Sequence, residues 1–425
     1  MPLAAALAAA QGIAQSPAWA AETATVAPAR PAAEADALPE LSPEELQAIQ
    51  AAFGDQPPDA TPAPPPPPAP GPATGALNAL ASTLQSMNPD LSFILDAALG
   101  YFSDTPRQTG GHDPNRTGFT FQQLELAVSA SVDPFLRFDA NIVLSQFGLE
   151  VEEAYATSLG LPAQLQLRAG QFLTPFGRQN PTHPHTWSFM DQPLVLGKFF
   201  GSEGSRGLGL EGSWLTPLPW YVELELAANE AGGACCARSF FGAQDLGVRT
   251  PADFVYTGRV EQFFPFDDDW SLLFGVSGQL GPNPTGNGNR TGIYGVDLYL
   301  RYRPVDSTLR STVTLTVEGL YRTRQVPDDR LVDVGGYAQL VWEFALQWAL
   351  GARYEYVGGV ANDPLDLDWD RARHRVSLQA TYYPSHFSRV RIQGNYDDPL
   401  YADGPIWAAL INLEIVVGAH GSHAF

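Results

Sequence analysis

The side chains of this 425-residue sequence that could do chemistry are its histidines and a set of glutamates and arginines. His183 and His185 flank Pro184, so one extended segment could offer two imidazoles, which are common zinc ligands. A structural or catalytic zinc site needs about three or four converging ligands, and this spacing supplies two. We therefore interpret His183 and His185 as ordinary polar loop residues, with weak metal capture by the pair as the alternative, and predict no bound cofactor.

Among the charged residues that strand parity assigns to the polar inner face, a group of glutamates lies within residues 150–225 and a group of arginines within residues 353–391. If the two groups face each other across a pore, their field orients polar solutes and penalises apolar ones. The alternative is local pairing of neighbours, as Arg353 with Glu355. The predicted pore-lining residues are Glu150, Glu152, Arg168, Glu211, Glu223, Glu225, Arg353, Arg373, Arg375, Arg389 and Arg391.

Composition and motifs argue against two function classes. A formal charge of −22 with Lys198 as the single lysine argues against a nucleic-acid partner, which needs clustered basic residues. The sequence holds no Gly-x-Ser-x-Gly, phosphate-cradling loop or His-Glu-x-x-His, so we predict no enzyme. Cys235 and Cys236 are adjacent and cannot join distant strands. We interpret them as incidental loop thiols, with a vicinal disulfide as the alternative.

The elements that position these residues are alternating strands, which begin at Leu91 and continue to the C-terminus. In the first run, Leu91, Phe93 and Leu95 share one face, and Ser92 and Asp96 share the other. Such alternation places one face in an apolar medium and the other in a polar medium. Full charges recur on the polar face, which the core of a soluble sandwich would not tolerate, and aromatic residues bracket the runs. The sequence therefore predicts an all-β, antiparallel transmembrane barrel of about 16 strands.

The connections between the predicted strands alternate between short turns and long loops. The longest, residues 174–207, follows the fifth predicted strand and is the third long loop. In sixteen-stranded general porins the loop at this place folds inward and narrows the channel. The predicted constriction residues in this loop are Arg178, His183, His185, Asp191, Lys198, Glu203 and Arg206.

The N-terminal part of the chain differs from the barrel. Residues 1–20 have a short apolar core and end in Ala18-Trp19-Ala20, a cleavage pattern typical of a signal peptide. Residues 21–75 predict a short helix and a Pro-rich periplasmic linker, residues 76–90 a short helical lead-in, and residues 91–425 the barrel. Beyond the signal there is no apolar run of about 18 residues, so no transmembrane helix is expected.

Three runs, residues 149–156, 165–172 and 174–177, resemble the "AY" strand and the "RxGQF…PFG" hairpin of the phosphate-selective porin family. The resemblance implies a sixteen-stranded, usually trimeric channel with an inward third loop. The anion selectivity of that family rests on a lysine cluster and an arginine ladder, and the lysine cluster has no counterpart here. The ending at residues 418–425 resembles myxobacterial outer-membrane proteins labelled zinc-regulated TonB-dependent receptors. Receptors of that class need about 22 strands and a plug.

Together these features predict an outer-membrane porin for passive diffusion of small hydrophilic solutes or ions through a charged lumen. The alternative is a substrate-specific channel or receptor for a metal such as zinc or an anion such as phosphate. A closed barrel serving as a surface enzyme or adhesin is a further alternative. The expected partners are outer-membrane lipid, lipopolysaccharide, two further copies in a homotrimer, and the barrel assembly machinery, which would read the last strand ending at Phe425.

Overall fold

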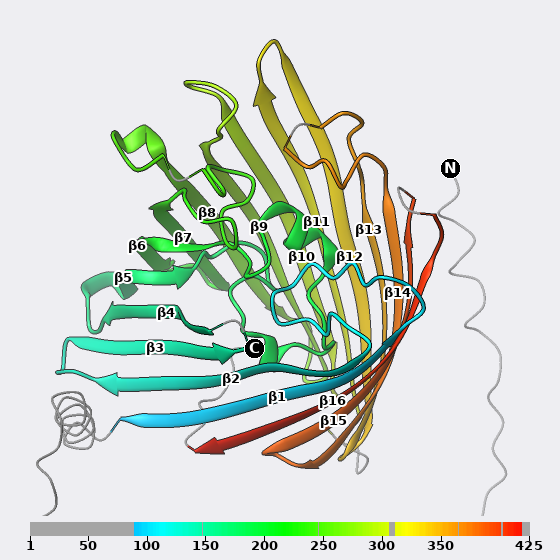
Figure 1. Cartoon of the computed structure of the whole chain (residues 1–425). Helices are drawn as coiled ribbons and strands as arrows, with labels where there is room; N and C mark the ends of the chain where they lie inside the picture. Colours follow the sequence, from blue (N-terminus) through cyan, green and yellow to red (C-terminus); the bar gives the residue numbers. More distant parts are fainter. Residues whose placement is uncertain are drawn as a thin grey trace, which may run out of the picture. The chain divides into compact units, whose positions relative to one another are not determined.

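The computed structural model describes residues 89–418, apart from residues 147, 245, 306–310, 364 and 401–402. These residues form a closed antiparallel barrel in which each strand pairs with the next and β16 pairs with β1 (Figure 1). The predicted all-β barrel and its strand number are therefore confirmed. The predicted signal peptide, linker and most of the lead-in lie outside the described residues, and so does Phe425.

The strands share the antiparallel ladder, and a few short helices lie in the connections. The strands are β1 (Asp90–Phe102), β2 (Gly118–Ser131), β3 (Leu136–Ser145), β4 (Gly148–Ser158), β5 (Leu165–Leu173), β6 (Arg206–Leu215), β7 (Tyr221–Glu230), β8 (Phe254–Pro265), β9 (Trp270–Pro282), β10 (Arg290–Tyr302), β11 (Thr312–Val326), β12 (Asp329–Ala345), β13 (Trp348–Val357), β14 (Arg373–Ser385), β15 (Ser388–Pro399) and β16 (Ile406–Gly418). The helices are η1 (Pro162–Gln164), η2 (Pro184–Thr186), α3 (Leu194–Phe199) and η3 (Pro251–Asp253). Within the described residues, no helix has the length and apolarity needed to cross a membrane.

The two faces of the barrel wall differ in polarity as the alternation predicts. On β16, Ile411 and Leu413 are exposed on the outside, whereas Asn412 and Glu414 between and beside them are buried inside. Trp270 and Trp342 are likewise exposed near the ends of their strands. The polar side chains therefore point into the barrel and the apolar ones point away from it, the reverse of a soluble sheet packed on a core.

A β-bulge alters the alternation on β4. Asn141 of β3 pairs with Glu153, and the next residue, Ile142, pairs with Val151, so Glu152 is the extra residue. Glu152 and Glu153 are consequently both buried on the inner side. Strict alternation would place Glu153 on the lipid-facing side, but the one inserted residue shifts the pattern by one position and turns Glu153 inward.

The longest connection runs from residue 174 to residue 205, between β5 and β6, as expected from the sequence. Other long connections span residues 103–117, 231–253 and 358–372. In the second of these, Cys235 and Cys236 form a vicinal disulfide, so the interpretation as free thiols was wrong. These long connections contribute side chains, such as His112, Asp191 and Lys198, that contact the inner face of the strands.

Candidate channel constriction

Residues 174–205, here called the inward segment, lie inside the barrel. The amide of Gly177 donates to the Ser277 hydroxyl on β9 at 3.0 Å, and the amide of Met190 donates to Gln393 on β15 at 3.2 Å. The amide of Leu194 donates to Glu355 on β13 at 3.1 Å. These acceptors lie on the polar inner face, far around the ring from β5 and β6, so the segment must cross the lumen (Figure 1).

The start of the inward segment is anchored on Glu318 of β11. The amides of Arg178 and Gln179 both donate to one carboxylate oxygen of Glu318, the second at 3.3 Å. The Tyr337 hydroxyl donates to the other oxygen at 2.6 Å. Gly177 lies next to this carboxylate with a φ of +63°, and a Cβ atom there would overlap Glu318. A glycine is therefore required for the close approach to the wall.

The tip of the inward segment is anchored through Asp191, which is fully buried. Its carboxylate pairs with Arg353 and lies 3.2 Å from Nη1 of Arg375. Gln393 and Asn395 donate to the same carboxylate at 2.8 Å and 3.0 Å. Burial acts to raise the pKa of Asp191, but Arg353 and Arg375 outweigh it and lower that pKa to about 2. The carboxylate thus stays charged and holds the tip against β13, β14 and β15.

The third anchor is α3, which places Lys198, the single lysine of the chain, against the barrel wall. Lys198 Nζ donates to Asp333 at 2.7 Å and to the carbonyl of Gly358 at 2.5 Å. Burial lowers the pKa of Lys198 to about 8, against the opposing attraction of Asp333. Val195 and Phe199 pack beside it in a cluster of buried apolar side chains. The end of the segment is therefore held by both an ion pair and apolar contacts.

The five arginines on β13–β15 that were predicted to line the pore are buried and engaged by neighbouring carboxylates, whereas Arg168 on β5 is half-buried. Arg353 and Arg375 both contact Glu355, at 2.5 Å and 2.9 Å. Arg373 pairs with Asp397 at 2.5 Å. Arg389 and Arg391 share Glu414, at 2.6 Å and 3.3 Å. This arrangement corresponds to the local-pairing alternative rather than to two opposed walls of unpaired charge.

The glutamates predicted to line the pore fall into two groups. Glu150 pairs with Arg206, Glu211 lies 3.5 Å from Arg168, and Glu152 belongs to a histidine cluster. Glu223 and Glu225 instead line a cavity of about 500 Å³ between the inward segment and the wall. The charged and histidine residues of that cavity are Arg178, His183, His185, Glu223, Glu225, Arg259, Glu261 and Glu343.

Of the residues predicted to form the constriction, Arg178, His183 and His185 border this cavity. Asp191 and Lys198 are fully buried in the anchors described above, and Arg206 is buried against Glu150. The guanidinium of Arg178 stacks on the Tyr299 ring at 3.7 Å, in cation–π geometry. The predicted residues therefore separate into a cavity-lining set (Arg178, His183 and His185), two anchoring residues (Asp191 and Lys198), Arg206 paired with Glu150, and Glu203, which contacts His112.

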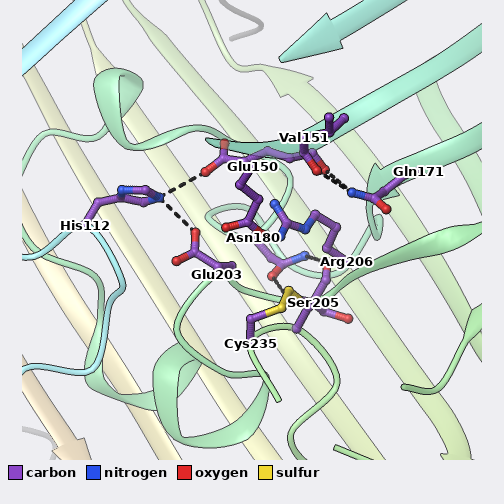
Figure 2. Close-up of a disulfide and its surroundings, with 11 residues drawn as sticks. His112, Glu150, Val151, Gln171, Asn180, Glu203, Ser205, Arg206 and Cys235 are labelled. Atoms are coloured by element: carbon purple, nitrogen blue, oxygen red, sulfur yellow. Dashed lines mark hydrogen bonds and ion pairs between the residues drawn. A yellow bond between two sulfur atoms is a disulfide. The ribbon is translucent and has the colours of Figure 1, made fainter. Parts of the chain in front are cut away.

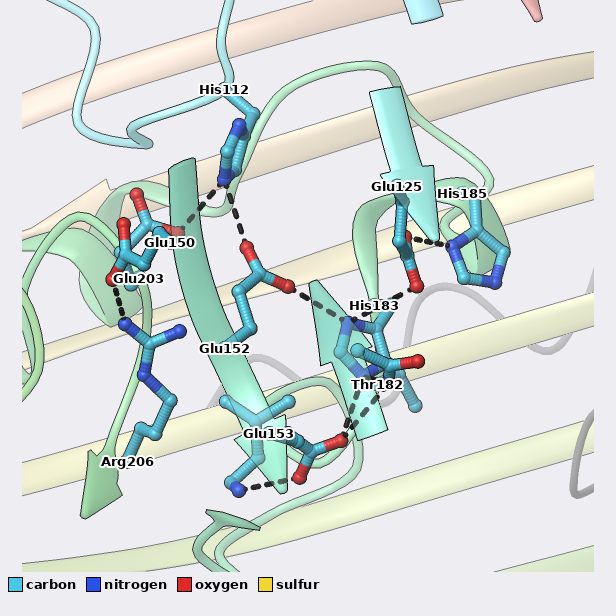
Figure 3. Close-up of polar contacts among 12 residues, drawn as sticks. His112, Glu125, Glu150, Glu152, Glu153, Thr182, His183, His185, Glu203 and Arg206 are labelled. Carbon is cyan, nitrogen blue, oxygen red and sulfur yellow. Dashed lines mark hydrogen bonds and ion pairs between the residues drawn. The ribbon is translucent and has the colours of Figure 1, made fainter. Parts of the chain in front are cut away.

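The histidine cluster joins the first loop, the wall and the inward segment (Figure 3). His112 Nε2 lies 3.0 Å from Glu152 and 3.0 Å from Glu203. The other oxygen of Glu152 lies 3.1 Å from Nδ1 of His183, whose Nε2 lies 2.8 Å from Glu153. Burial lowers the pKa of His112, but hydrogen bonds to Glu152 and Glu203 outweigh burial and raise it well above its usual value.

His183 and His185 do not converge on one point. Their rings stack with centroids 5.8 Å apart, and Nδ1 of His185 lies 2.9 Å from Glu125 on β2. Burial acts to lower the pKa of His183, but Glu125 and Glu152 raise it well above the usual value. Potential metal-ligating atoms come within 4.8 Å of one another at His112, Glu152 and Glu203, a group that the sequence analysis missed.

Comparison with known proteins places the chain in a family. No protein-family model matches the sequence. An uncharacterized protein of Aquifex aeolicus is 33% identical over 348 residues, which cover 74% of this chain and 73% of that protein. The chain belongs to the family of that Aquifex protein. The sequence relationship extends over most of both chains.

Solved structures share the barrel fold at low sequence identity. OprB of Pseudomonas putida has a TM-score of 0.52 and 10% identity, covering 81% of this chain and 98% of its own. An anion-selective porin from Comamonas acidovorans has a TM-score of 0.51 and 12% identity, covering 77% of this chain and 99% of its own. These similarities show a porin-like barrel fold. They do not support phosphate selectivity, which was considered as an alternative, or the resemblance to myxobacterial proteins.

Proposed function

We propose that the chain is an outer-membrane channel of the porin kind, which lets small hydrophilic solutes or ions diffuse past the inward segment. The observation that carries this proposal is the anchoring of that segment at three places inside a closed barrel. The apolar outer face suits contact with lipid, and the polar inner face suits contact with water. The inward segment then sets the narrowest part of the path.

The ion preference of this channel follows from the side chains that stay accessible. The five predicted pore-lining arginines on β13–β15 are engaged by carboxylates. The wall of the cavity beside the inward segment holds four glutamates, two arginines and two histidines, and Arg259 pairs with Glu225 and Glu261, so Glu223 and Glu343 are the acidic side chains outside those pairs. Acidic side chains in a pore favour cations. We therefore expect a modest preference for cations, and the same pairing of arginines weakens the case for a phosphate channel.

The proposal includes the cellular setting. The chain would be exported through residues 1–20, with residues 21–90 as a periplasmic extension ahead of the barrel. Its apolar outer face would contact lipid and lipopolysaccharide, its last strand would be read by the barrel assembly machinery, and three copies would assemble. Mass measurement of the detergent-solubilised protein tests the homotrimer, because a monomeric mass would contradict it.

Single-channel recording in a planar bilayer tests the channel itself. We expect discrete current steps, and a reversal potential under a KCl gradient whose sign corresponds to cation preference. A reversal potential of the opposite sign would contradict the selectivity argument. A folded barrel without current would instead favour the closed surface protein considered above.

A further inference from the structure

Three ligand-type side chains from separate parts of the chain meet at one point inside the barrel. His112 comes from the loop after β1, Glu152 from the bulge of β4, and Glu203 from the end of the inward segment (Figure 3). Their ligand atoms lie within 4.8 Å of one another, with His112 3.0 Å from each carboxylate. In a tetrahedral zinc site, bonds of about 2.0–2.1 Å place neighbouring ligands roughly 3.3 Å apart, so these separations need little adjustment.

The surroundings of His112 fix which ring nitrogen faces the two carboxylates. Nδ1 lies 3.4 Å from the carbonyl of Gln122, and the Gln122 amide donates to the carbonyl of His112 at 2.8 Å. If Nδ1–H donates to that carbonyl, the neutral ring directs the lone pair of Nε2 at Glu152 and Glu203. This orientation is favourable only when Nε2 carries a proton, which makes the ring an imidazolium, or when a cation lies between the ring and the carboxylates. A backbone carbonyl that accepts from the second nitrogen is the usual partner of a metal-ligating histidine.

The charge balance of the cluster also indicates a cation. Four carboxylates, those of Glu125, Glu152, Glu153 and Glu203, face the imidazoles of His112, His183 and His185. The nearest basic side chains already pair elsewhere, Arg206 with Glu150 and Arg391 with Glu414. Even three protonated imidazoles would leave one net negative charge, and buried charges require pairing or metal coordination.

The site has room for one ion. A cavity of about 30 Å³ is lined by His112, Glu152, Glu203 and His183. A single water needs about 10–15 Å³ of such space. An ion with one remaining water therefore fits without displacing the wall.

Glu203 is held in place by the neighbouring connection. Its amide donates to the carbonyl of Cys235 at 3.0 Å, so the turn with the vicinal disulfide supports it (Figure 2). The amide of Gly111 donates to the carbonyl of Ser202 at 3.0 Å, and a Cβ at Gly111 would overlap the Glu203 carboxylate. The backbone thus brings the two loops together before any ion binds.

We propose that His112, Glu152 and Glu203 bind a divalent transition-metal ion of the Zn²⁺ type, with His183 orienting Glu152 from behind. One imidazole and two carboxylates leave a position for water and suit such an ion better than Mg²⁺, which prefers oxygen ligands alone. The bound ion links the first loop, the inward segment and β4. Its effect on current rests on the proposed channel function, whereas binding itself does not.

Calorimetric titration of the full-length protein, folded in detergent and free of an affinity tag, tests the site with Zn²⁺ and Mg²⁺ separately. We expect one Zn²⁺ site that Mg²⁺ does not fill. His112→Gln and Glu203→Gln should each weaken Zn²⁺ binding at least about 100-fold, whereas Glu230→Gln at the exposed end of β7, the matched control, should leave it unchanged. Binding of Co²⁺ in its place should give the visible absorption of a four-coordinate ion, a readout that needs no variant.

Three results would overturn the inference: no Zn²⁺ binding by the folded protein, equal binding by wild type and both ligand variants, or loss of binding only in His183→Gln and His185→Gln. Heat-modifiable mobility on a gel shows whether each variant has folded. If a ligand variant does not fold, the Co²⁺ spectrum of the wild-type protein tests the site instead. Zn²⁺ binding without any single-channel current would support the site and contradict the proposed channel. Current without Zn²⁺ binding would support the proposed channel and contradict the metal site.

Discussion

The tip of the inward segment offers a direct test of how the lumen is narrowed. Replacing Asp191 with alanine removes the carboxylate that Arg353, Arg375, Gln393 and Asn395 all contact. The side chain is fully buried, so water does not replace these contacts while the tip stays in place. The variant therefore removes one of the two carboxylates that Arg353 and Arg375 share and leaves both guanidinium groups with Glu355 alone.

The size of the effect follows from the cost of breaking a buried ion pair, about 3–5 kcal/mol. The contacts of Asp191 exist only when the tip lies against the wall. Removing them therefore destabilises the anchored position of the segment and leaves the free energy of a displaced position unchanged. At about 1.4 kcal/mol for each factor of ten, the equilibrium between the two positions should shift roughly 10²- to 10⁴-fold towards displacement. Asp191 takes no part in the hydrogen bonds between paired strands, so the barrel itself should remain folded.

Single-channel conductance measures this displacement. We expect Asp191→Ala to give larger current steps than wild type, with more frequent transitions between levels. Asp267→Ala, in the exposed turn between β8 and β9, removes the same group outside the lumen and should conduct like wild type. Equal conductance of Asp191→Ala and wild type, with both barrels folded, would refute the reasoning.

Three further predictions concern the anchors and the metal site. Glu318→Ala removes the acceptor of two amides of the inward segment, so hydrogen exchange at residues 178–179 should accelerate at least about tenfold while β11 stays protected; unchanged rates would contradict this anchor. Gly111→Ala should displace the Glu203 carboxylate and weaken Zn²⁺ binding about tenfold or more, whereas Gly404→Ala, where a Cβ meets open space, is the control and should not. The folded pKa of Asp191 lies below its ordinary value of about 3.8, so its anchoring is present above that pH and is lost as the pH falls towards about 2. The contribution of this anchor predicts a constant conductance from pH 8 to pH 5 and a rise below about pH 4. A conductance that stays constant down to pH 2 would contradict the role of the Asp191 carboxylate in anchoring the tip.

The barrel could be predicted from the sequence because its determinants are local. Alternation of the kind seen at Leu91–Asp96 is a property of neighbouring residues, and so is the length of the connection after β5. Glu153 could not be placed by the same rule, since a bulge depends on the register of the partner strand. The adjacent acids Glu152 and Glu153 in an otherwise alternating run were the available signal for it.

The site was harder to predict because its residues meet only in the folded chain. The pairing of Arg353 with Glu355 was foreseeable from spacing along one strand, but the approach of Asp191 to Arg353 depends on how the inward segment crosses the lumen. His112 meets Glu203 because two loops fold inward together. Sequence spacing carries no information on that distance, so the metal prediction stopped at His183 and His185.

The most direct test of the account is single-channel conductance, recorded side by side for the wild-type protein and for the Asp191→Ala/Glu318→Ala double variant. The double variant loses the anchors at the tip and at the start of the inward segment. We predict current steps from both proteins, with clearly larger steps from the double variant. Folded barrels that carry no current, or identical steps from both proteins, would contradict a channel narrowed by this segment.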